Sequence, residues 1–286
     1  MTIVEVLKLS ADFLARHGSD SSRLDAEVLL AHTLNLRRLD LYLKFDRPLT
    51  EPELSAYRAL VARRGKGEPV AYLVGHKEFM GLDFEVTPVV LVPNPDTEVL
   101  VQRAVAIARD SAQPLRVADV GTGSGCIAVS IAHYAPNTEV WATDISAEAL
   151  AIAARNVARH ALTERVHVMH ADLLSGVDGR FDLVCANLPY VAAGTKLPAE
   201  VSAQPATALY AEERGAAMVR RLLSEAPVHL SVAGRVLAEI DPAIAGEVGE
   251  MAAQRFAGQQ IHRDLGGHAR VLEAWSSLPM SSEPSA

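Results

Sequence analysis

Apolar residues in the first part of the chain recur three to four positions apart, which is the spacing of one face of a helix. A threonine cap with proline in the first turn, at Thr50 and Pro52, marks the start of one such segment. The pattern predicts helices around residues 7–14, 26–34, 40–43 and 54–61. We therefore expect a small helical domain over residues 1–73.

The pattern changes after residue 73. Residues 78–86 alternate between apolar and polar around a glycine, which predicts a β-hairpin. Two prolines flank Asn94 and form a rigid, extended connector. A helix over residues 99–108 then begins a second domain. We assign residues 74–95 to a hairpin and linker, and residues 96–275 to the second domain.

From residue 115 onward, strand-like apolar runs alternate with helical segments. Predicted strands cover residues 115–120, 139–143, 166–170, 182–186, 235–240 and 270–275. Predicted helices cover residues 124–133, 147–159, 212–226 and 243–256. Repeated strand–helix units predict an α/β fold with a mostly parallel sheet covered on both faces. Serine, proline and glutamate dominate residues 276–286, which we predict to be a disordered tail.

Composition and charge exclude several classes of protein. The net charge of −8 disfavours an enzyme that wraps nucleic acid, because nucleic acid is itself polyanionic. No apolar run is long enough to span a membrane, and the amphipathic N-terminus does not resemble a signal peptide. Cys126 and Cys185 lie in apolar runs, which predicts reduced, buried thiols in a cytoplasmic protein. The histidines show no metal-ligand spacing, so we assign no metal.

A glycine-rich loop, DVGTGSG, lies where the predicted strand 115–120 ends and a helix begins. Without side chains, Gly121, Gly123 and Gly125 let the backbone turn sharply and approach a ligand closely. The spacing is G-x-G-x-G rather than the G-x-G-x-x-G of dinucleotide sites, and no Gly-Lys-Ser/Thr of a phosphate loop follows. The loop is therefore a candidate site for a nucleoside-containing cofactor.

Two further strand ends carry suitable polar groups. Asp144 ends the second strand, where a carboxylate can accept both hydroxyls of a ribose; capping the helix after Ser146 is the alternative. The third strand ends at Asp172 and Leu173, which can flank an adenine ring. In this order, the loop and the two strand ends resemble the cofactor site of class I S-adenosylmethionine methyltransferases. NAD binding is the alternative.

The sequence Asn-Leu-Pro-Tyr, residues 187–190, directly follows a predicted apolar strand. An amide nitrogen is a poor nucleophile, so an enzyme that methylates it must hold it in line and accept its N–H hydrogens. Asn187 offers a side-chain carbonyl for this and Leu188 a backbone carbonyl. Pro189 stiffens the turn, and Tyr190 offers a flat face for a planar amide or base. An ordinary loop is the alternative, because Asn, Pro and Tyr all suit turns.

Nearly the whole chain, to about Trp275, resembles the peptide chain release factor glutamine methyltransferases, which modify the glutamine of a Gly-Gly-Gln motif. The segments that carry the resemblance are DAEVLLAHTLNL, ARRGKGEPVAYLVGHKEFMGLDFEV, VPNPDTEVLV, ADVGTGSGCIAVSIA, ATDIS, NLPYV and EVSAQPATALYAEERGAAMVRRLL. The resemblance implies a Rossmann-like, seven-stranded sheet with S-adenosylmethionine as cofactor, S-adenosylhomocysteine as product and a release factor as partner. The helical domain would help to recognise that partner.

The resemblance also assigns residues to the site. Asn187 would contact both cofactor and substrate, and Leu188, Pro189 and Tyr190 would complete a substrate clamp. The remaining cofactor-binding residues would be Gly121, Thr122, Gly123, Ser124, Gly125, Asp144 and Leu173.

Three positions depart from the family pattern, all on the expected substrate side. Leu188 replaces a proline, Asn94 replaces an arginine, and Met80 stands where an aromatic residue is common. Asn-Leu-Pro-Tyr also occurs in adenine-N6 ribosomal RNA methyltransferases, so the loop alone does not choose amide over adenine. A methyltransferase acting on a small metabolite or a nucleic-acid amine remains an alternative, as does a binding module without activity.

Overall fold

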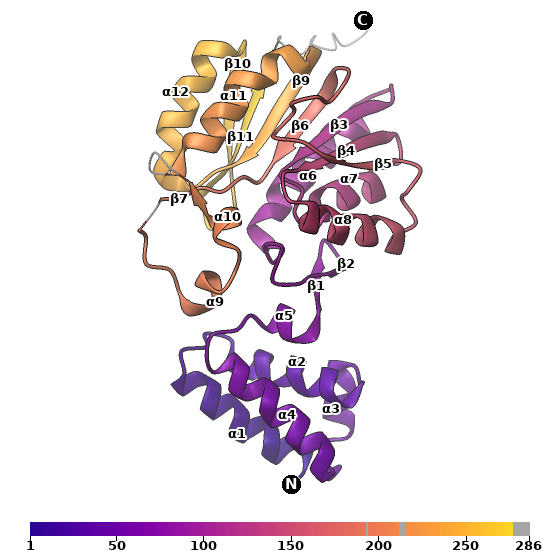
Figure 1. Cartoon of the computed structure of the whole chain (residues 1–286), viewed down its shortest axis with the longest axis vertical. Helices are drawn as coiled ribbons and strands as arrows, with labels where there is room; N and C mark the ends of the chain where they lie inside the picture. The colour runs from indigo at the N-terminus through magenta and orange to yellow at the C-terminus, as the bar shows by residue number, and fades with distance from the viewer. Residues whose placement is uncertain (193, 212–214, 277–286) are drawn as a thin grey trace, which may run out of the picture. The chain divides into compact units, whose positions relative to one another are not determined.

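The computed structural model describes residues 1–192, 194–211 and 215–276 (Figure 1). The chain forms two compact units. One comprises residues 1–76 together with residues 196–204, and the other comprises residues 77–195 and 205–286. In the described residues, no helix is long and apolar enough to cross a membrane.

The first unit is helical, and each predicted helix is present. Its helices are α1 (Ile3–Arg16), α2 (Ser22–Leu34), α3 (Arg38–Leu43), α4 (Glu51–Arg64), α5 (Val70–Val74) and, from the later segment, α9 (Ala199–Ser202). Thr50 caps α4 by accepting the Glu53 N–H, as its sequence predicted. The core of the unit includes Leu14, Leu30 and Tyr57, each fully buried.

Residues 196–204 join the helical unit through the buried side chain of Arg64. Arg64 pairs with Asp25 at 2.7 Å and with Glu200 at 2.6 Å. Gly67 lies so close to Ala199 that a Cβ at Gly67 would be 2.6 Å from the Ala199 Cβ. Residues 196–204 therefore pack as part of the helical unit, although they follow the Asn-Leu-Pro-Tyr loop in the sequence.

The second unit contains a seven-stranded sheet in the order β10-β11-β9-β6-β3-β4-β5. Its strands are β3 (Leu115–Val120), β4 (Thr138–Asp144), β5 (Val166–His170), β6 (Phe181–Ala186), β9 (Leu230–Glu239), β10 (Gly258–Arg263) and β11 (Ala269–Trp275). The five strands from β9 to β5 pair in parallel, and β11 and β10 add antiparallel pairs. The expectation of a mostly parallel, Rossmann-like sheet is confirmed.

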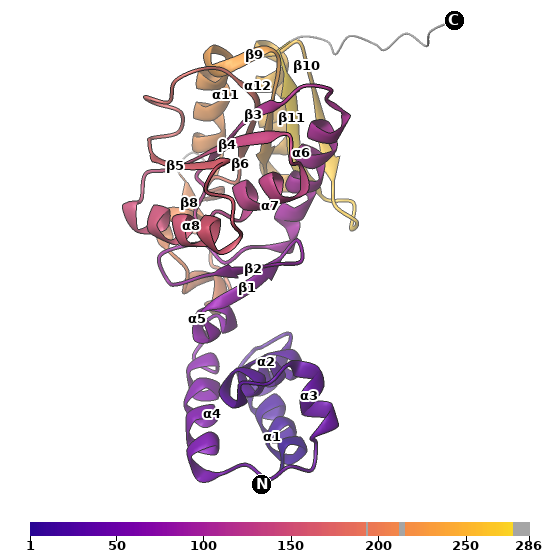
Figure 2. The ribbon, with the colours of Figure 1, turned by 90° about the vertical axis from the view of Figure 1, so that its right-hand side faces the viewer.

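Helices cover both faces of the sheet (Figures 1 and 2). Alternate residues of a strand point to opposite faces, so Val120 of β3 joins one core cluster and Val117 joins the other. The first cluster contains residues of α11 (Ala217–His229) and α12 (Ala245–Arg255), and the second contains residues of α6 (Glu98–Asp110), α7 (Cys126–Tyr134) and α8 (Ala147–Arg159).

Short elements complete the second unit. They are the hairpin β1 (His76–Phe79) and β2 (Leu82–Glu85), the 3-10 turns η1 (Pro95–Thr97) and η3 (Pro242–Ile244), helix α10 (Ala206–Leu209), and the paired strands β7 (Val191–Ala192) and β8 (Tyr210–Ala211). The hairpin was predicted from the alternation around Gly81, whereas β7 and β8 were not predicted.

Three further differences from the sequence prediction concern the main sheet and one of its helices. Strand β10 was missed because its sequence, GQQIHR, is mostly polar, as an edge strand allows. Strand β9 begins at Leu230, five residues before the predicted start. Helix α11 continues past Pro227 to His229, although we expected it to end before the proline. The predicted start of that helix at residue 212 and the tail from residue 277 lie outside the described residues.

Sheet register brings the candidate residues to one edge. Val120, at the end of β3, lies opposite Thr143 of β4 and Ala186 of β6. The next residue of each of these three strands or loops therefore lies at the same edge of the sheet. These residues are Gly121 after β3, Asp144 at the end of β4, and Asn187 after β6.

Candidate functional site

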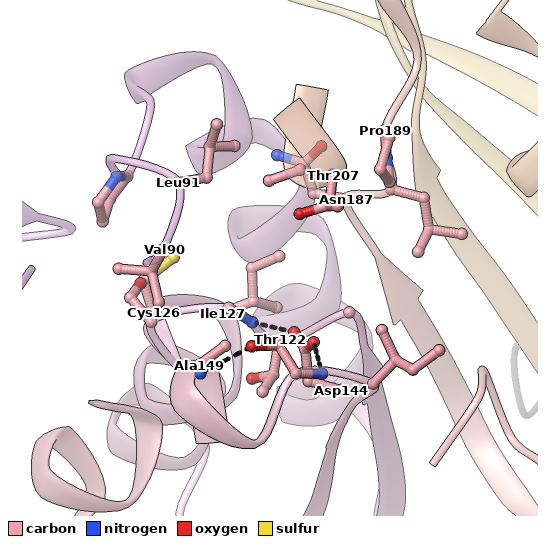
Figure 3. Close-up of a pocket in the computed structure, with 18 of the residues that line it drawn as sticks. Val90, Leu91, Thr122, Cys126, Ile127, Asp144, Ala149, Asn187, Pro189 and Thr207 are labelled. Atoms are coloured by element: carbon pink, nitrogen blue, oxygen red, sulfur yellow. Dashed lines mark hydrogen bonds between the residues drawn. The ribbon is translucent and has the colours of Figure 1, made fainter. Parts of the chain in front are cut away.

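A cleft opens at this edge of the sheet, within the second unit (Figure 3). Its walls come from the glycine loop, the ends of β4 and β5, the loop after β6 and the segment before η1. Figure 3 shows Val90, Asp144 and Asn187 reaching the cleft from three of these segments. Because the segments lie far apart in the sequence, the cleft exists only in the folded chain.

The glycine loop has the sharp turn that its sequence predicted. Gly121 and Gly125 have φ angles of 72° and 81°, which side-chain-bearing residues rarely adopt. A Cβ at Gly125 would lie 3.2 Å from the Ala153 Cα, so the loop also needs glycine for close contact with α8. The Gly121 and Thr122 N–H groups both donate to the Thr143 carbonyl, at 2.9 and 2.8 Å. The loop is therefore held against the end of β4.

Asp144 holds the glycine loop and the turn before α8 at the same time. Its Oδ2 accepts the Gly123 N–H at 2.9 Å, and its Oδ1 accepts the Ser146 N–H at 2.9 Å. The cap of α8 is Ser146, whose hydroxyl accepts the Ala149 N–H at 3.1 Å, so the capping role that we considered for Asp144 is wrong. The carboxylate also lines the cleft, and each oxygen keeps a further lone pair for a ligand. The two roles are compatible.

Asp119 supports the glycine loop through hydrogen bonds, a role that its sequence pattern did not predict. It is fully buried, and its Oδ2 accepts the Thr122 hydroxyl at 2.6 Å and the Ala128 N–H at 3.1 Å. Burial raises the pKa of Asp119 to about 7, and the bond from Thr122 partly opposes that rise. An acidic residue two positions before the first glycine was the available signal.

Asn156 links the hairpin to the glycine loop and was also missed. This fully buried residue of α8 donates from Nδ2 to the Ser124 carbonyl at 2.8 Å and to the Glu85 carbonyl at 3.0 Å. Its Oδ1 accepts the Glu85 N–H at 2.8 Å. All of its polar atoms are therefore engaged in holding the loop and β2 to α8. A lone asparagine within a helix gave no sequence signal for this role.

The end of β5 lies where we expected it. Leu173 lines the cleft with a φ of 51°, and its carbonyl accepts the Thr143 hydroxyl at 2.9 Å. Asp172 also lines the cleft, and its Oδ1 accepts a bond from Arg221 at 2.8 Å. Leu173 thus adds an apolar surface beside Asp144, as an adenine ring requires.

The Asn-Leu-Pro-Tyr loop contributes three of its four residues to the cleft lining: Asn187, Leu188 and Pro189. Leu188 is 4% exposed, and its Cδ2 would lie 2.9 Å from a Cβ at Gly121. Tyr190 is absent from the residues lining the cleft. Its hydroxyl donates to Glu239 Oε1 at 3.2 Å. The flat-face role given to Tyr190 therefore stays a prediction.

The three departures from the family pattern have different positions. Leu188 fills space beside the glycine loop. Asn94 lines the cleft, and its Oδ1 accepts the Asp96 N–H at 3.1 Å, so it caps η1. Met80, with a φ of 52°, forms the turn of the hairpin, where its carbonyl accepts the Tyr134 hydroxyl at 2.6 Å. Met80 does not line the cleft, so its placement on the substrate side stays a prediction.

The cysteines are both free. Cys185 is buried in the sheet as predicted, whereas Cys126 is partly exposed and lines the cleft. Burial of its thiol nevertheless raises the pKa of Cys126 to about 12, so the group stays a neutral thiol and is no nucleophile. Other cleft residues that the sequence did not single out lie in segments without a motif. They include Val89, Val90, Leu91 and Val92 of the loop before η1, and Thr207 and Ala208 of α10.

Comparison with known proteins gives matches over both units. The family model of the PrmC N-terminal domain matches residues 5–75, and that of the methyltransferase small domain matches residues 96–209. A release factor glutamine methyltransferase of Rhodopirellula baltica is 41% identical over 282 residues, which cover 95% of each chain. Another, of Chlorobaculum tepidum, is 40% identical over 92% of this chain and 93% of its own length.

A solved methyltransferase structure from Pyrococcus furiosus is similar in fold. It has a TM-score of 0.55 at 20% sequence identity, and the match covers 78% of this chain and all of that one. This similarity supports the α/β architecture of the sheet and its helices.

Proposed function

Since the chain belongs to the family of release factor glutamine methyltransferases, we propose that it methylates a glutamine side-chain amide in a peptide chain release factor. The methyl donor is S-adenosylmethionine, and the product is S-adenosylhomocysteine. The acceptor is the glutamine of the Gly-Gly-Gln motif, and the reaction takes place in the cytoplasm, where release factors act.

The cleft has the groups that this cofactor requires. Asp144 supplies a carboxylate for the ribose hydroxyls, and Leu173 supplies an apolar wall for the adenine. The positive φ angles of the loop favour glycine, and glycine has no side chain that would block the approach of the cofactor to the backbone. When bound, the sulfonium group supplies a methyl that is activated for transfer. We assign the cofactor to Gly121, Thr122, Gly123, Ser124, Gly125, Asp144, Leu173 and Asn187.

Asn187 carries the chemical part of the proposal. Its amide nitrogen already donates to Thr97 Oγ1 at 3.0 Å, so its carbonyl oxygen is the atom left to accept an N–H of the substrate. The Leu188 carbonyl is a second acceptor on the same loop, and Pro189 restricts the turn. During methyl transfer, positive charge would develop on the substrate nitrogen, and the preplaced carbonyl oxygens of Asn187 and Leu188 would stabilise it. The nitrogen would then release one proton to solvent water.

The decisive experiment uses a purified release factor and labelled S-adenosylmethionine. We expect intact-mass analysis to find one added methyl group on the native release factor and none on a variant in which the motif glutamine is replaced by alanine. Equal labelling of the two release factors would refute the proposal. Transfer to the RNA or small-molecule fraction of an extract, with none to protein, would favour the alternative acceptors.

We propose that the helical unit helps to recognise the release factor. Helix α3 and the residues directly after it expose large apolar side chains. Exposed apolar side chains that cluster on a surface are typical of a binding site for a partner. Leu39 is 62% exposed, Leu43 is 70% exposed and Phe45 is 56% exposed. We call these three residues the α3 patch.

A further inference from the structure

Thr97 lies at the junction between the connector and α6, yet its side chain bonds to the loop after β6. It is the last residue of η1 and is only 2% exposed. Asn187 donates from Nδ2 to Thr97 Oγ1 at 3.0 Å, across 90 positions of sequence. Both residues line the cleft. The hydroxyl is therefore placed where it can fix one side of the Asn187 amide.

The two sides of that amide are chemically opposite. The NH2 side only donates hydrogen bonds, and the carbonyl side only accepts them. A substrate amide or amine presents N–H groups, so it can bond to the carbonyl side of Asn187 but not to the NH2 side. Rotation of the Asn187 amide by half a turn would place its NH2 group against the N–H group of the substrate, and neither can accept a hydrogen bond. The bond to Thr97 opposes that rotation.

The Thr97 hydroxyl also lies near the buried carboxyl of Glu239. Glu239 is the last residue of β9 and is 1% exposed. Burial raises the pKa of this carboxyl, whereas the neighbouring Thr97 and Tyr190 hydroxyls lower it. The Thr97 hydroxyl, which accepts from Asn187, can therefore turn its own hydrogen toward Glu239.

Sheet register explains why these groups meet. Ala186 of β6 lies opposite Ala238 of β9, so Asn187 and Glu239 leave adjacent parallel strands at the same level. The same carboxyl accepts the Tyr190 hydroxyl at 3.2 Å. Glu239 therefore holds Tyr190 at one end of the Asn-Leu-Pro-Tyr loop, and Thr97 holds Asn187 at the other end. A carboxyl buried beside a cleft is costly to desolvate, which is typical of functional sites.

We infer that Thr97 and Glu239 are positioning residues. Thr97 orients the Asn187 amide so that its carbonyl oxygen faces the substrate nitrogen, and Glu239 holds Tyr190 at the other end of the same loop. The inference rests on the proposed function for the identity of the acceptor. It adds two residues that bring no group into contact with the reacting atoms and that act through Asn187 and Tyr190.

The test compares Thr97→Val, which keeps the shape but removes the hydroxyl, with Thr97→Ser, which keeps the hydroxyl. We expect Thr97→Val to lower kcat about 10- to 100-fold, somewhat less than the loss of a direct transition-state donor. The KM for S-adenosylmethionine and its calorimetric affinity should stay within about twofold. Thr97→Ser should restore kcat to within about threefold of the wild type. Glu239→Gln replaces one carboxyl oxygen by an NH2 donor that can oppose the Tyr190 and Thr97 hydroxyls, and it should lower kcat as well.

Thr138→Val is the matched control. Thr138 is also 2% exposed and bonds through its hydroxyl, in this case to the Ala135 carbonyl at 2.8 Å. It is the first residue of β4, at the opposite end of that strand from Asp144 and the cleft. It should lose stability comparably to Thr97→Val while keeping wild-type kcat. If Thr97→Val kept wild-type kcat, or if Thr138→Val lost kcat equally, the inference would be overturned.

A second readout separates this inference from the proposed function. The side-chain NH2 resonances of Asn187, assigned from their loss in Asn187→Ala, report the bond to Thr97 without any acceptor. We expect them to shift in Thr97→Val and to stay near their wild-type positions in Thr97→Ser. Unshifted resonances in Thr97→Val would refute the inference even if the release factor is methylated. Shifted resonances would support it even if the release factor is not the acceptor.

Discussion

The Asp144 carboxylate accepts the backbone N–H of Gly123 at 2.9 Å, so the acidic end of β4 holds the loop that follows β3. The residue proposed to bind the ribose is therefore also part of the frame that shapes the cofactor loop. Substitution of Asp144 should weaken cofactor binding in two ways. It removes a carboxylate that accepts hydrogen bonds from the ribose, and it loosens the glycine loop.

We expect Asp144→Ala to weaken S-adenosylmethionine binding by about 2 to 3 kcal/mol, because charge-assisted hydrogen bonds to the ribose are lost. Isothermal titration calorimetry measures this directly. Glu139→Ala is the control, since Glu139 lies on the same strand but pairs with His167 on the surface. An unchanged affinity in Asp144→Ala would contradict the assigned role.

Asn187→Ala should lower kcat by at least about 100-fold, the usual cost of removing a group that stabilises developing charge. Cofactor affinity should change little, because the other cofactor-binding residues are intact. Single-turnover methylation of the release factor, together with calorimetry of the cofactor, separates the two effects. Wild-type turnover in this variant would refute the role of Asn187.

Gly125→Ala should destabilise the fold by about 2 to 4 kcal/mol, because strain at positive φ adds to a clash with α8. Gly18→Ala is a matched control. Gly18 has a similar φ of 84°, but no atom lies within 4 Å of the added Cβ, so only the strain of about 1 to 2 kcal/mol remains. Urea denaturation of both variants measures the difference, and equal losses would show that contact with Ala153 is unimportant.

Glu239 should make stability fall as pH rises. Burial raises its pKa to about 7, and nearby Asp96 adds to the rise, while Thr97, Tyr190 and Arg270 lower it. The folded state therefore holds this proton more tightly than the unfolded chain does. The stabilisation is complete below about pH 4.5 and is lost progressively up to about pH 7.

The measurement is the free energy of unfolding of the wild type and of Glu239→Gln at several pH values. The variant cannot ionise at this position, so its stability relative to the wild type should increase from about pH 4.5 to 7 and then level off. Asp119, whose pKa burial also raises to about 7, is present in both proteins and cancels in the comparison. A constant difference over this range would contradict the prediction.

The double variant Leu39→Ser/Leu43→Ser should raise the KM for the release factor about 10-fold or more, since two exposed apolar anchors of the α3 patch are lost. Affinity for S-adenosylmethionine should not change. Leu265→Ser is the control, because Leu265 is fully exposed in the turn between β10 and β11. An unchanged KM in the double variant would exclude the α3 patch from recognition.

The sequence predicted those parts of the fold whose signals are local. Strands β3 and β5 and helix α8 begin and end where their apolar patterns predict. Strand β10 was missed because a polar edge strand is stabilised by pairing with β11 rather than by its own pattern.

The candidate site also has some residues that the sequence predicted and others that it did not. Gly121, Asp144 and Asn187 lie at strand ends, so their meeting could be predicted from a parallel sheet. The link between Thr97 and Asn187, and that between Tyr190 and Glu239, join segments 90 and 49 positions apart. No local motif encodes such bonds. The register between β6 and β9 brings Tyr190 near Glu239, whereas Thr97 reaches Asn187 from η1, outside the sheet. For the same reason, Asn156 gave no signal within α8.

Residues 196–204 have a consequence for how the protein can be divided. Because this segment packs with residues 1–76, a single cut near His76 does not separate two complete folding units. A fragment beginning at Lys77 would carry Glu200 away from Arg64 and leave a stretch of chain with nothing to fold against. Chimaeras that exchange the recognition helices between relatives should therefore exchange both stretches together, as one inherited module.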